Sequence, residues 1–339
     1  MKVTINDVAK LAAVSIKTVS RVMNSEASVR ETTRDRVQAA IDELHYQPNL
    51  AARSLAGTKS YNIAFIYDNP NAYYVIDMQN GILSECKKQG YELLIHPCNS
   101  KSETICEELK KMVQHSRVAG IVMTPPFSEM PEIVEALSAL DVKIIRIVSG
   151  KESPDDLSPC VMINDKDAAK NVTQHLIDLG HKNIGFINGG MEHMSSHERL
   201  GGYKEALRCN DIEVKDDHII AGQYSFESGV QGANELLSGK DRPTAIFACN
   251  DEIAAGALFA ARLMNINIPD QLSIIGFEDS PFSRQTWPKL TTAHQPNRII
   301  AQHAAALLIA ATRHQTLSNE TQSFIPELVV RDSTSRFVQ

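Results

Sequence analysis

The chain has 339 residues, of which 43% are hydrophobic and 22% charged, a balance typical of a folded protein with more than one core. It contains no apolar run near the roughly 18 residues of a membrane-spanning helix. Residues 1–7 lack the apolar stretch of a signal peptide, so we expect neither a membrane protein nor a secreted one. The six cysteines lie far apart without a C-x-x-C pair, which favours buried reduced thiols over disulfides or a zinc site and indicates the cytoplasm.

Charge is distributed unevenly along the chain. The net charge is −7, yet residues 1–60 hold nine Lys or Arg against six Asp or Glu, a net +3, and the remainder hold 25 against 35, a net −10. A mildly basic N-terminal segment therefore precedes an acidic body. This asymmetry predicts nucleic-acid contact through the first 60 residues, with chance as the alternative, because +3 alone is weak evidence.

Residues 4–46 show the pattern of three short helices. Thr4 precedes Ile5-Asn6-Asp7 in a variant of the capping box, and Ser15 precedes Ile16-Lys17-Thr18 in the same way. A third amphipathic helix is indicated by apolar residues at i, i+3, i+4 and i+7, namely Val37, Ala40, Ile41 and Leu44. Two closely connected helices covered by a third predict a helix-turn-helix reader of the DNA major groove.

The second predicted helix carries the side chains expected to contact DNA. We expect Ile16, Lys17 and Arg21 to point to base edges, and Ser15, Ser20 and Asn24 to lie where phosphates pass. The alternative for this polar face is an ordinary solvated helix surface.

The order of residues in this segment closely resembles the lactose-repressor and galactose-repressor family of bacterial regulators. The resemblance is carried by Thr4-Ile5-x-Asp7-Val8-Ala9, Ala12-x-Val14-Ser15-x-x-Thr18-Val19-Ser20-Arg21-Val22-x-Asn24 and Tyr46-x-Pro48-Asn49-x-x-Ala52-Arg53-Ser54-Leu55, and it continues to Leu328-Val329-Val330-Arg331-Asp332-Ser333-Thr334. It implies a DNA-binding domain at 1–46, followed by a hinge helix and linker at 47–60. The DNA-binding residues that it implies are Thr4, Ser15, Ile16, Lys17, Thr18, Ser20, Arg21, Asn24, Asn49, Ala52 and Leu55.

The hinge has a physical argument of its own. Pro48 and Gly57 bracket about eight helix-forming residues, too few for a stable isolated helix, so we expect this segment to fold only when it is held. The resemblance assigns Leu55 as the wedge that enters the minor groove, with Ala52 small enough for close approach. An interdomain linker is the alternative.

From residue 62 the pattern changes to alternating apolar strands and amphipathic helices. Strands are predicted around 62–67, 92–95, 120–123, 143–148, 183–187, 244–248 and 272–277. The rhythm predicts an α/β body of two doubly wound parallel sheets. With the resemblance, it implies an all-α helix-turn-helix head and hinge helix before a two-lobed, periplasmic-binding-protein-like effector and dimerisation domain at 61–339. Lobe 1 is expected at about 61–161 and 292–321, and lobe 2 at about 162–291 and 322–339.

Ligands of such sheets bind at the carboxyl ends of the strands. The residues expected there to contact an effector are Asp68, Tyr73, Tyr74, Asp167, Ser195, Arg199, Tyr224, Asn250, Glu278 and Trp287. Carboxylates, amides, an arginine and aromatic rings are the groups that bind sugar hydroxyls and C–H faces. Asp167 has a helix start as its alternative, and Trp287 a packing role. The resemblance implies the same site for Arg199, Asn250 and Glu278, although the family usually carries aspartate at the last position.

These observations predict a sequence-specific transcriptional regulator and not an enzyme. We find no intact nucleophile elbow, phosphate loop, dinucleotide fingerprint or metal-ligand spacing, so we expect no cofactor and no metal. The resemblance implies a homodimer, with a tetramer possible, that represses sugar-utilisation genes until a small-molecule inducer, expected to be a sugar, releases it from double-stranded operator DNA. The alternatives are a co-repressed regulator that responds to a purine or another metabolite, and a stand-alone sugar-binding or sugar-converting protein.

Overall fold

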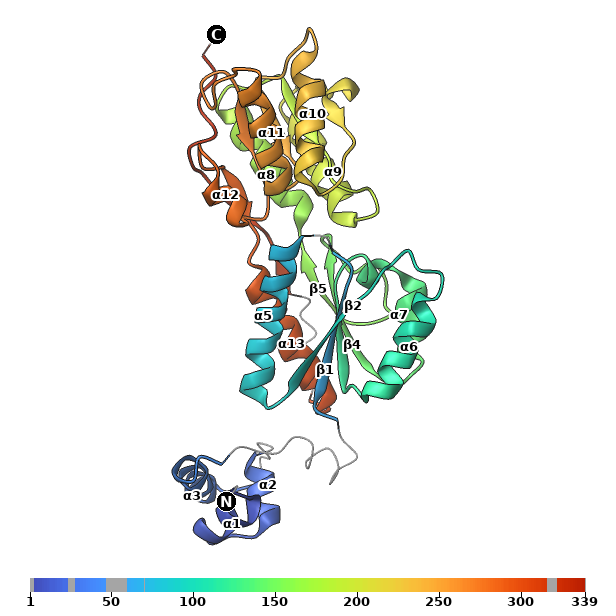
Figure 1. The fold of residues 1–339 in the computed structure, drawn as a ribbon, viewed down its shortest axis with the longest axis vertical. Coiled ribbons are helices and arrows are strands. Elements are labelled where there is room, and N and C mark those ends of the chain that lie inside the picture. The colour runs from blue at the N-terminus through green and yellow to red at the C-terminus, as the bar shows by residue number, and fades with distance from the viewer. Residues whose placement is uncertain (1–2, 24–27, 47–59, 70, 316–321, 339) are drawn as a thin grey trace. The chain divides into compact units, whose positions relative to one another are not determined.

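A computed structural model describes residues 3–23, 28–46, 60–69, 71–315 and 322–338. The chain divides into two units, Met1–Tyr61 and Asn62–Gln339, and each is described here by itself (Figure 1). Four residues predicted to bind DNA, namely Asn24, Asn49, Ala52 and Leu55, lie outside the described residues.

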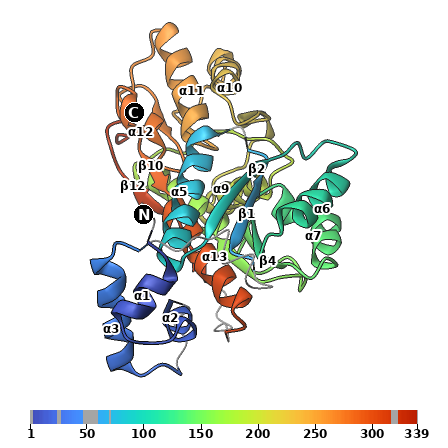
Figure 2. The same ribbon diagram turned by 60° about the horizontal axis from the view of Figure 1, so that its bottom comes forward.

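The first unit contains the three predicted helices, α1 (Ile5–Leu11), α2 (Ile16–Met23) and α3 (Glu31–Glu43) (Figure 2). Their apolar faces meet in a small core in which Val8, Val19 and Val37 have no exposed surface. Burial of one stripe from each helix is what stabilises helices this short, because they are marginal in isolation. The predicted helix-turn-helix architecture is confirmed.

The second unit contains a six-stranded parallel sheet in the order β11-β5-β4-β3-β1-β2. Its strands and helices are β1 (Asn62–Tyr67), α5 (Ala72–Gln89), β2 (Glu92–Pro97), α6 (Ile105–Ser116), β3 (Gly120–Met123), η1 (Phe127–Glu129), α7 (Pro131–Ser138), β4 (Lys143–Ser149), β5 (Cys160–Ile163), α13 (Asn297–Thr312) and β11 (Ser323–Phe324). Helices α5 and α13 cover one face of this sheet, and α6 and α7 cover the other (Figure 1). Gly90 ends α5 with a φ of 74°, a conformation that side chains disfavour.

The same unit contains a second, four-stranded parallel sheet in the order β7-β6-β8-β9. Its elements are α8 (Asp165–Asp178), β6 (Ile184–Ile187), α9 (Met194–Cys209), η2 (Asp216–His218), β7 (Ile219–Ile220), α10 (Phe226–Ser238), β8 (Ala245–Ala248), α11 (Asp251–Leu263), β9 (Ser273–Ile275) and α12 (Pro281–Gln285). Strands β6 and β8 are fully buried, as expected for parallel strands covered on both faces.

The chain passes between the two sheets after β5, after β10 (Thr292–His294) and before β12 (Glu327–Val329). Strands β10 and β12 pair with each other as an antiparallel ribbon, with Ala293 opposite Leu328. The segment Ser323–Phe324, which we expected in lobe 2, pairs with β5 in the first sheet. The other lobe boundaries stay predictions.

Candidate functional site

The exposed face of α2 carries the side chains predicted to read base edges. Ile16, Lys17 and Arg21 are exposed, and Ile16 keeps 49% of its surface accessible, which is high for an isoleucine. Val19 and Val22, on the opposite face, are buried in the core of the three helices. The helix therefore presents one apolar and two cationic side chains to solvent, a composition suited to thymine methyl groups and guanine acceptors.

The hydroxyl groups of the same unit are engaged at helix starts. The Thr4 hydroxyl donates to Asp7 Oδ2 over 2.7 Å, and this bond together with one from the Thr4 amide holds the pKa of Asp7 below its usual value. Ser15 Oγ accepts from the Thr18 amide over 3.1 Å and lies 2.9 Å from the Thr18 hydroxyl. Thr4, Ser15 and Thr18 thus stabilise the ends of α1 and α2, and Ser20 is half-buried. Their predicted contacts with DNA stay predictions.

In the second unit, a cleft of about 500 Å³, counting the solvent at its mouth, lies where strand ends of the two sheets face each other. Its lining residues are Asn69, Asn71, Tyr74, Pro125, Ile147, Val148, Ser149, Ile163, Asp165, His193, Ser195, Arg199, Tyr224, Glu278 and Gln295.

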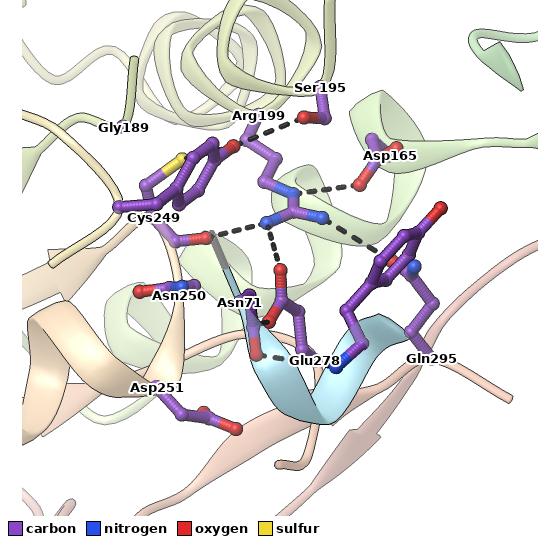
Figure 3. Close-up of polar contacts among 12 residues, drawn as sticks. Asn71, Asp165, Gly189, Ser195, Arg199, Cys249, Asn250, Asp251, Glu278 and Gln295 are labelled. Carbon is purple, nitrogen blue, oxygen red and sulfur yellow. Dashed lines mark hydrogen bonds and ion pairs between the residues drawn. The ribbon is translucent and has the colours of Figure 1, made fainter. Parts of the chain in front are cut away.

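Arg199 of α9 lies at the centre of the polar contacts in this cleft (Figure 3). Its Nε donates to Asp165 Oδ1 over 2.7 Å, Nη1 to the Cys249 carbonyl over 2.8 Å and Nη2 to Gln295 Oε1 over 3.3 Å. The guanidinium also lies 3.9 Å from the centre of the Phe277 ring. Burial opposes its charge, but the carboxylates around it keep its pKa above the usual value, so it is a fixed cation.

Glu278 joins Arg199 from the strand end after β9. Its Oε1 lies 3.5 Å from Arg199 Nη1, and its Oε2 accepts a hydrogen bond of 2.7 Å from Asn71 Nδ2, so it connects residues beside both sheets. Burial raises its pKa to about 7, against the attraction of Arg199. Its φ of 97° places a non-glycine residue in a rare backbone conformation, a kind of strain that is concentrated at functional sites.

The structure brings half of the residues predicted to bind an effector into this cleft, namely Tyr74, Ser195, Arg199, Tyr224 and Glu278. Five others lie elsewhere. Asp68 accepts from the Ser100 amide and hydroxyl, and Tyr73 packs edge-on against Phe282.

The remaining three of those five do not line the cleft either. Asp167 lies at the start of α8, where it accepts from Asn164 Nδ2, and Asn250 caps α11 through its Oδ1. The Asn250 amide nitrogen is buried without a hydrogen-bond partner among the described residues. Trp287 is 72% exposed, so it is not a packing anchor in this structure, and its predicted contact with a ligand stays a prediction.

Ten of the fifteen lining residues are absent from the predicted effector-binding residues, and the polar ones among them are Asn69, Asn71, Ser149, Asp165, His193 and Gln295. Asn71 caps α5 by accepting from the Tyr73 and Tyr74 amides, so its amide group is fixed at the end of the helix that follows β1. The available signal was a helix start shortly after a strand: Asn71 is the N-cap of α5 in the loop after β1, and Asp165 is the first residue of α8 after its N-cap Asn164. Gln295 follows β10, a three-residue strand with no periodic pattern to mark it.

Comparisons with known proteins agree with both halves of this description. The family model described as bacterial regulatory proteins, lacI family, matches residues 4–49, and that of a periplasmic binding protein-like domain matches residues 173–334. Catabolite control protein A of Priestia megaterium is 33% identical over 336 residues, which cover 98% of this chain and all of that protein. The HTH-type transcriptional repressor PurR of Mannheimia succiniciproducens is 32% identical over 98% of this chain and 99% of its own length.

Solved structures show the same similarity. The lac repressor dimer bound to operator and the anti-inducer ONPF matches with a TM-score of 0.76 and 27% identity, over 99% of this chain and 100% of that one. The transcriptional regulator CelR in complex with cellobiose matches with a TM-score of 0.74 and 26% identity, over 98% of this chain and 100% of that one.

No helix in the described part of the chain is long and apolar enough to cross a membrane. The expected head, the expected pair of parallel sheets and the two matched domains all point to one class of protein. The chain belongs to the LacI family of bacterial regulatory proteins, as a DNA-binding transcriptional regulator, not an enzyme, with a helix-turn-helix head and a periplasmic-binding-protein-like effector domain.

Proposed function

We propose that this regulator represses sugar-utilisation genes and is released from its operator by a neutral sugar. The observation that carries the proposal is the buried Arg199 guanidinium, which contacts Asp165 through Nε and Glu278 through Nη1. Two carboxylates around one cation leave no excess positive charge, so the site disfavours phosphates and other anions. The cleft presents hydrogen-bond donors next to acceptors. A sugar hydroxyl both donates and accepts, so it can bond to a neighbouring donor and acceptor at the same time.

We favour release over co-repression because of the family resemblance, and a cleft that draws its groups from both sheets lets a ligand act on the arrangement of the two lobes. A ligand that exchanges bonds with Asn71 on one side and Glu278 on the other binds unequally to different arrangements of the two lobes. If the lobe arrangement that the sugar stabilises binds the operator more weakly, the sugar lowers operator affinity by some factor. Operator DNA must then lower the affinity for the sugar by the same factor.

We further propose that the regulator acts as a homodimer in the cytoplasm, where it meets chromosomal DNA, and that it binds a pseudo-palindromic operator. One head with a net charge of +3 contacts few phosphates, and a two-fold pair doubles that number. The lac repressor, similar over the whole chain, is a dimer on its operator. A tetramer is the alternative assembly.

The test is a titration of fluorescently labelled DNA from upstream of the chain's own gene, followed by anisotropy and by sedimentation of the complex. We expect a mass of two chains per operator, and release by one or more neutral sugars. A single chain on saturated operator would refute the dimer. Tighter binding with purine bases would instead support the co-repressed alternative, which the PurR similarity favours.

A further inference from the structure

Helix α9 carries Ser195 and Arg199 into the cleft, but it begins without a cap from its own sequence. Its N-cap residue is His193, whose side chain makes no capping hydrogen bond, and its first turn contains no acidic residue. Four other helices of the unit, α5, α8, α10 and α11, are each capped by the side chain of the residue before them. The first amides of a helix are unpaired and carry a partial positive charge, so α9 needs an acceptor from elsewhere.

A carboxylate from beside the other sheet takes the place of this cap. Glu129 ends η1, which follows β3 of the six-stranded sheet, and its Oε2 accepts a hydrogen bond of 3.2 Å from the Met194 amide, the first of α9. Its Oε1 accepts a second bond of 3.3 Å from the Ser149 amide at the end of β4. One side chain therefore bonds both to the six-stranded sheet and to the start of a helix that belongs to the four-stranded sheet.

The turn that carries Glu129 is held firmly by the six-stranded sheet. The Ser128 carbonyl accepts a hydrogen bond of 3.2 Å from Nη1 of Arg146 in β4, and Arg146 has no exposed surface. The Glu129 amide donates to the Pro126 carbonyl over 2.9 Å. A displacement of α9 relative to that sheet would therefore break the bond to Met194 and would not carry Glu129 along.

Glu129 lies beside the cleft without lining it. Burial and the nearby Asp165 carboxylate raise its pKa to about 7, against the two amide bonds, which favour the charged form. Above pH 7 the side chain is ionised, and its negative charge lies at the positive end of α9. Ser149 also donates from its hydroxyl to Asp165 over 2.6 Å, and Asp165 accepts from Arg199 Nε, so the cap belongs to the same network as the central cation.

We propose that Glu129 is a positioning residue of the effector switch, which caps α9 from the opposite sheet and so couples the arrangement of the two lobes to the placement of Ser195 and Arg199. When the lobes separate, α9 loses its cap and the cleft loses the lining groups of one side. The cap and a ligand that contacts both lobes therefore stabilise the same arrangement, and each strengthens the other. This inference rests on the proposed function, because release by a sugar is one of its two readouts, and it assigns no contact between Glu129 and the ligand.

The first experiment needs neither sugar nor DNA. Millisecond hydrogen–deuterium exchange of the full-length protein at pH 8, resolved to single amides, should show about three- to tenfold faster exchange at Met194 in Glu129→Ala, the loss of one cap. The Ser228 amide is the internal reference, because α10 is capped by Ser225 beside the same sheet. Glu132→Ala is the matched control, since this carboxylate is exposed in the first turn of α7 and its loss should leave both amides unchanged.

The second experiment measures release from labelled operator DNA at pH 8 with glucose, galactose, maltose, cellobiose and lactose. For each sugar that releases the wild type, Glu129→Ala should need about a three- to tenfold higher concentration for half-release, while Glu132→Ala should need the wild-type concentration. Glu129→Gln keeps one carbonyl oxygen as an acceptor, so it should fall between the two. It also replaces the alanine variant if that variant does not fold.

The outcomes separate this inference from the proposed function. Unchanged exchange at Met194 in both Glu129 variants, with the reference amide steady, overturns the cap. Faster exchange at Met194 with unchanged half-release concentrations shows a structural cap only, and overturns Glu129 as a positioning residue. If operator binding is intact and no sugar releases the wild type, the proposed function fails and the role of Glu129 in release fails with it, whereas the exchange result alone then decides the cap.

Discussion

Replacing Arg199 with alanine removes the central cation of the effector cleft. The side chain is 2% exposed, and the substitution leaves the equally buried Asp165 carboxylate without its charged partner. Breaking a buried ion pair at one member costs about 3–5 kcal/mol, because the remaining charge stays desolvated. The Cys249 carbonyl and Gln295 lose their donors as well. We therefore expect Arg199→Ala to lose its response to the sugar and also to destabilise the effector domain.

Urea unfolding of the full chain, followed by intrinsic fluorescence, measures the stability effect, and operator release measures the response. Asp165→Asn in the Arg199→Ala background is the informative companion, because it removes the orphaned charge and should recover part of the lost stability without restoring release. An unchanged unfolding midpoint for Arg199→Ala would refute the energetic reasoning. Release at the wild-type sugar concentration would show that Arg199 has only a structural role.

Four further results are expected. Burial raises the pKa of Glu278 to about 7, so the native state binds a proton at this residue more tightly than the unfolded chain does. The wild type should therefore lose stability relative to Glu278→Gln as the pH rises from about 4.5 through 7. A constant difference in urea midpoints over that range would contradict this expectation. Lys17→Ala should cost about 1–3 kcal/mol of operator affinity and relax one base position, whereas equal weakening on all sequences would assign Lys17 to a phosphate. Ser15→Ala should lower the stability of the head by about 0.5–2 kcal/mol through loss of the α2 cap, measured by thermal unfolding of the full chain, and an unchanged transition would leave the hydroxyl to DNA alone. Leu55→Ala should lessen operator bending in a gel assay without changing sugar binding, and unchanged bending would remove Leu55 as the wedge.

The sequence was most informative where periodicity and caps coincide. Thr4 and Ser15 marked the starts of α1 and α2, and apolar runs marked β1, β3, β4, β6 and β8, because local hydrogen bonds and burial of both faces leave a direct trace in residue order. The buried strand β5 (Cys160–Ile163) was not predicted. Strands of two or three residues, such as β10 and β12, leave no such trace, because they are defined by pairing between residues 33 or more positions apart in the chain. Such strands depend on tertiary contacts, which local residue order does not reveal.

The cleft shows the same division. Arg199 and Glu278 were predicted as residues of the site, but the sequence gives no sign that Asp165 and not Asp167 faces the guanidinium, because the two lie in one helical turn and differ only in the direction of the side chain. Trp287 was selected as the single tryptophan in a loop near the crossover, and only the fold reveals that it faces solvent.

The ribbon formed by β10 and β12 also has a mechanical consequence. Glu278 forms a backbone bridge with His294 at the end of this ribbon, so the residue whose carboxylate bonds across the cleft is joined directly to one of the segments that connect the two sheets. A paired ribbon resists twisting more than a single strand does, which leaves bending as the soft degree of freedom. The six residues of β1 extend roughly 20 Å from the cleft edge of the sheet to its opposite edge at Asn62. A rotation of the six-stranded sheet by a few degrees about its cleft edge would therefore move Asn62 by about 1–2 Å. Shifts of this size are the ones by which packed interfaces change between two states.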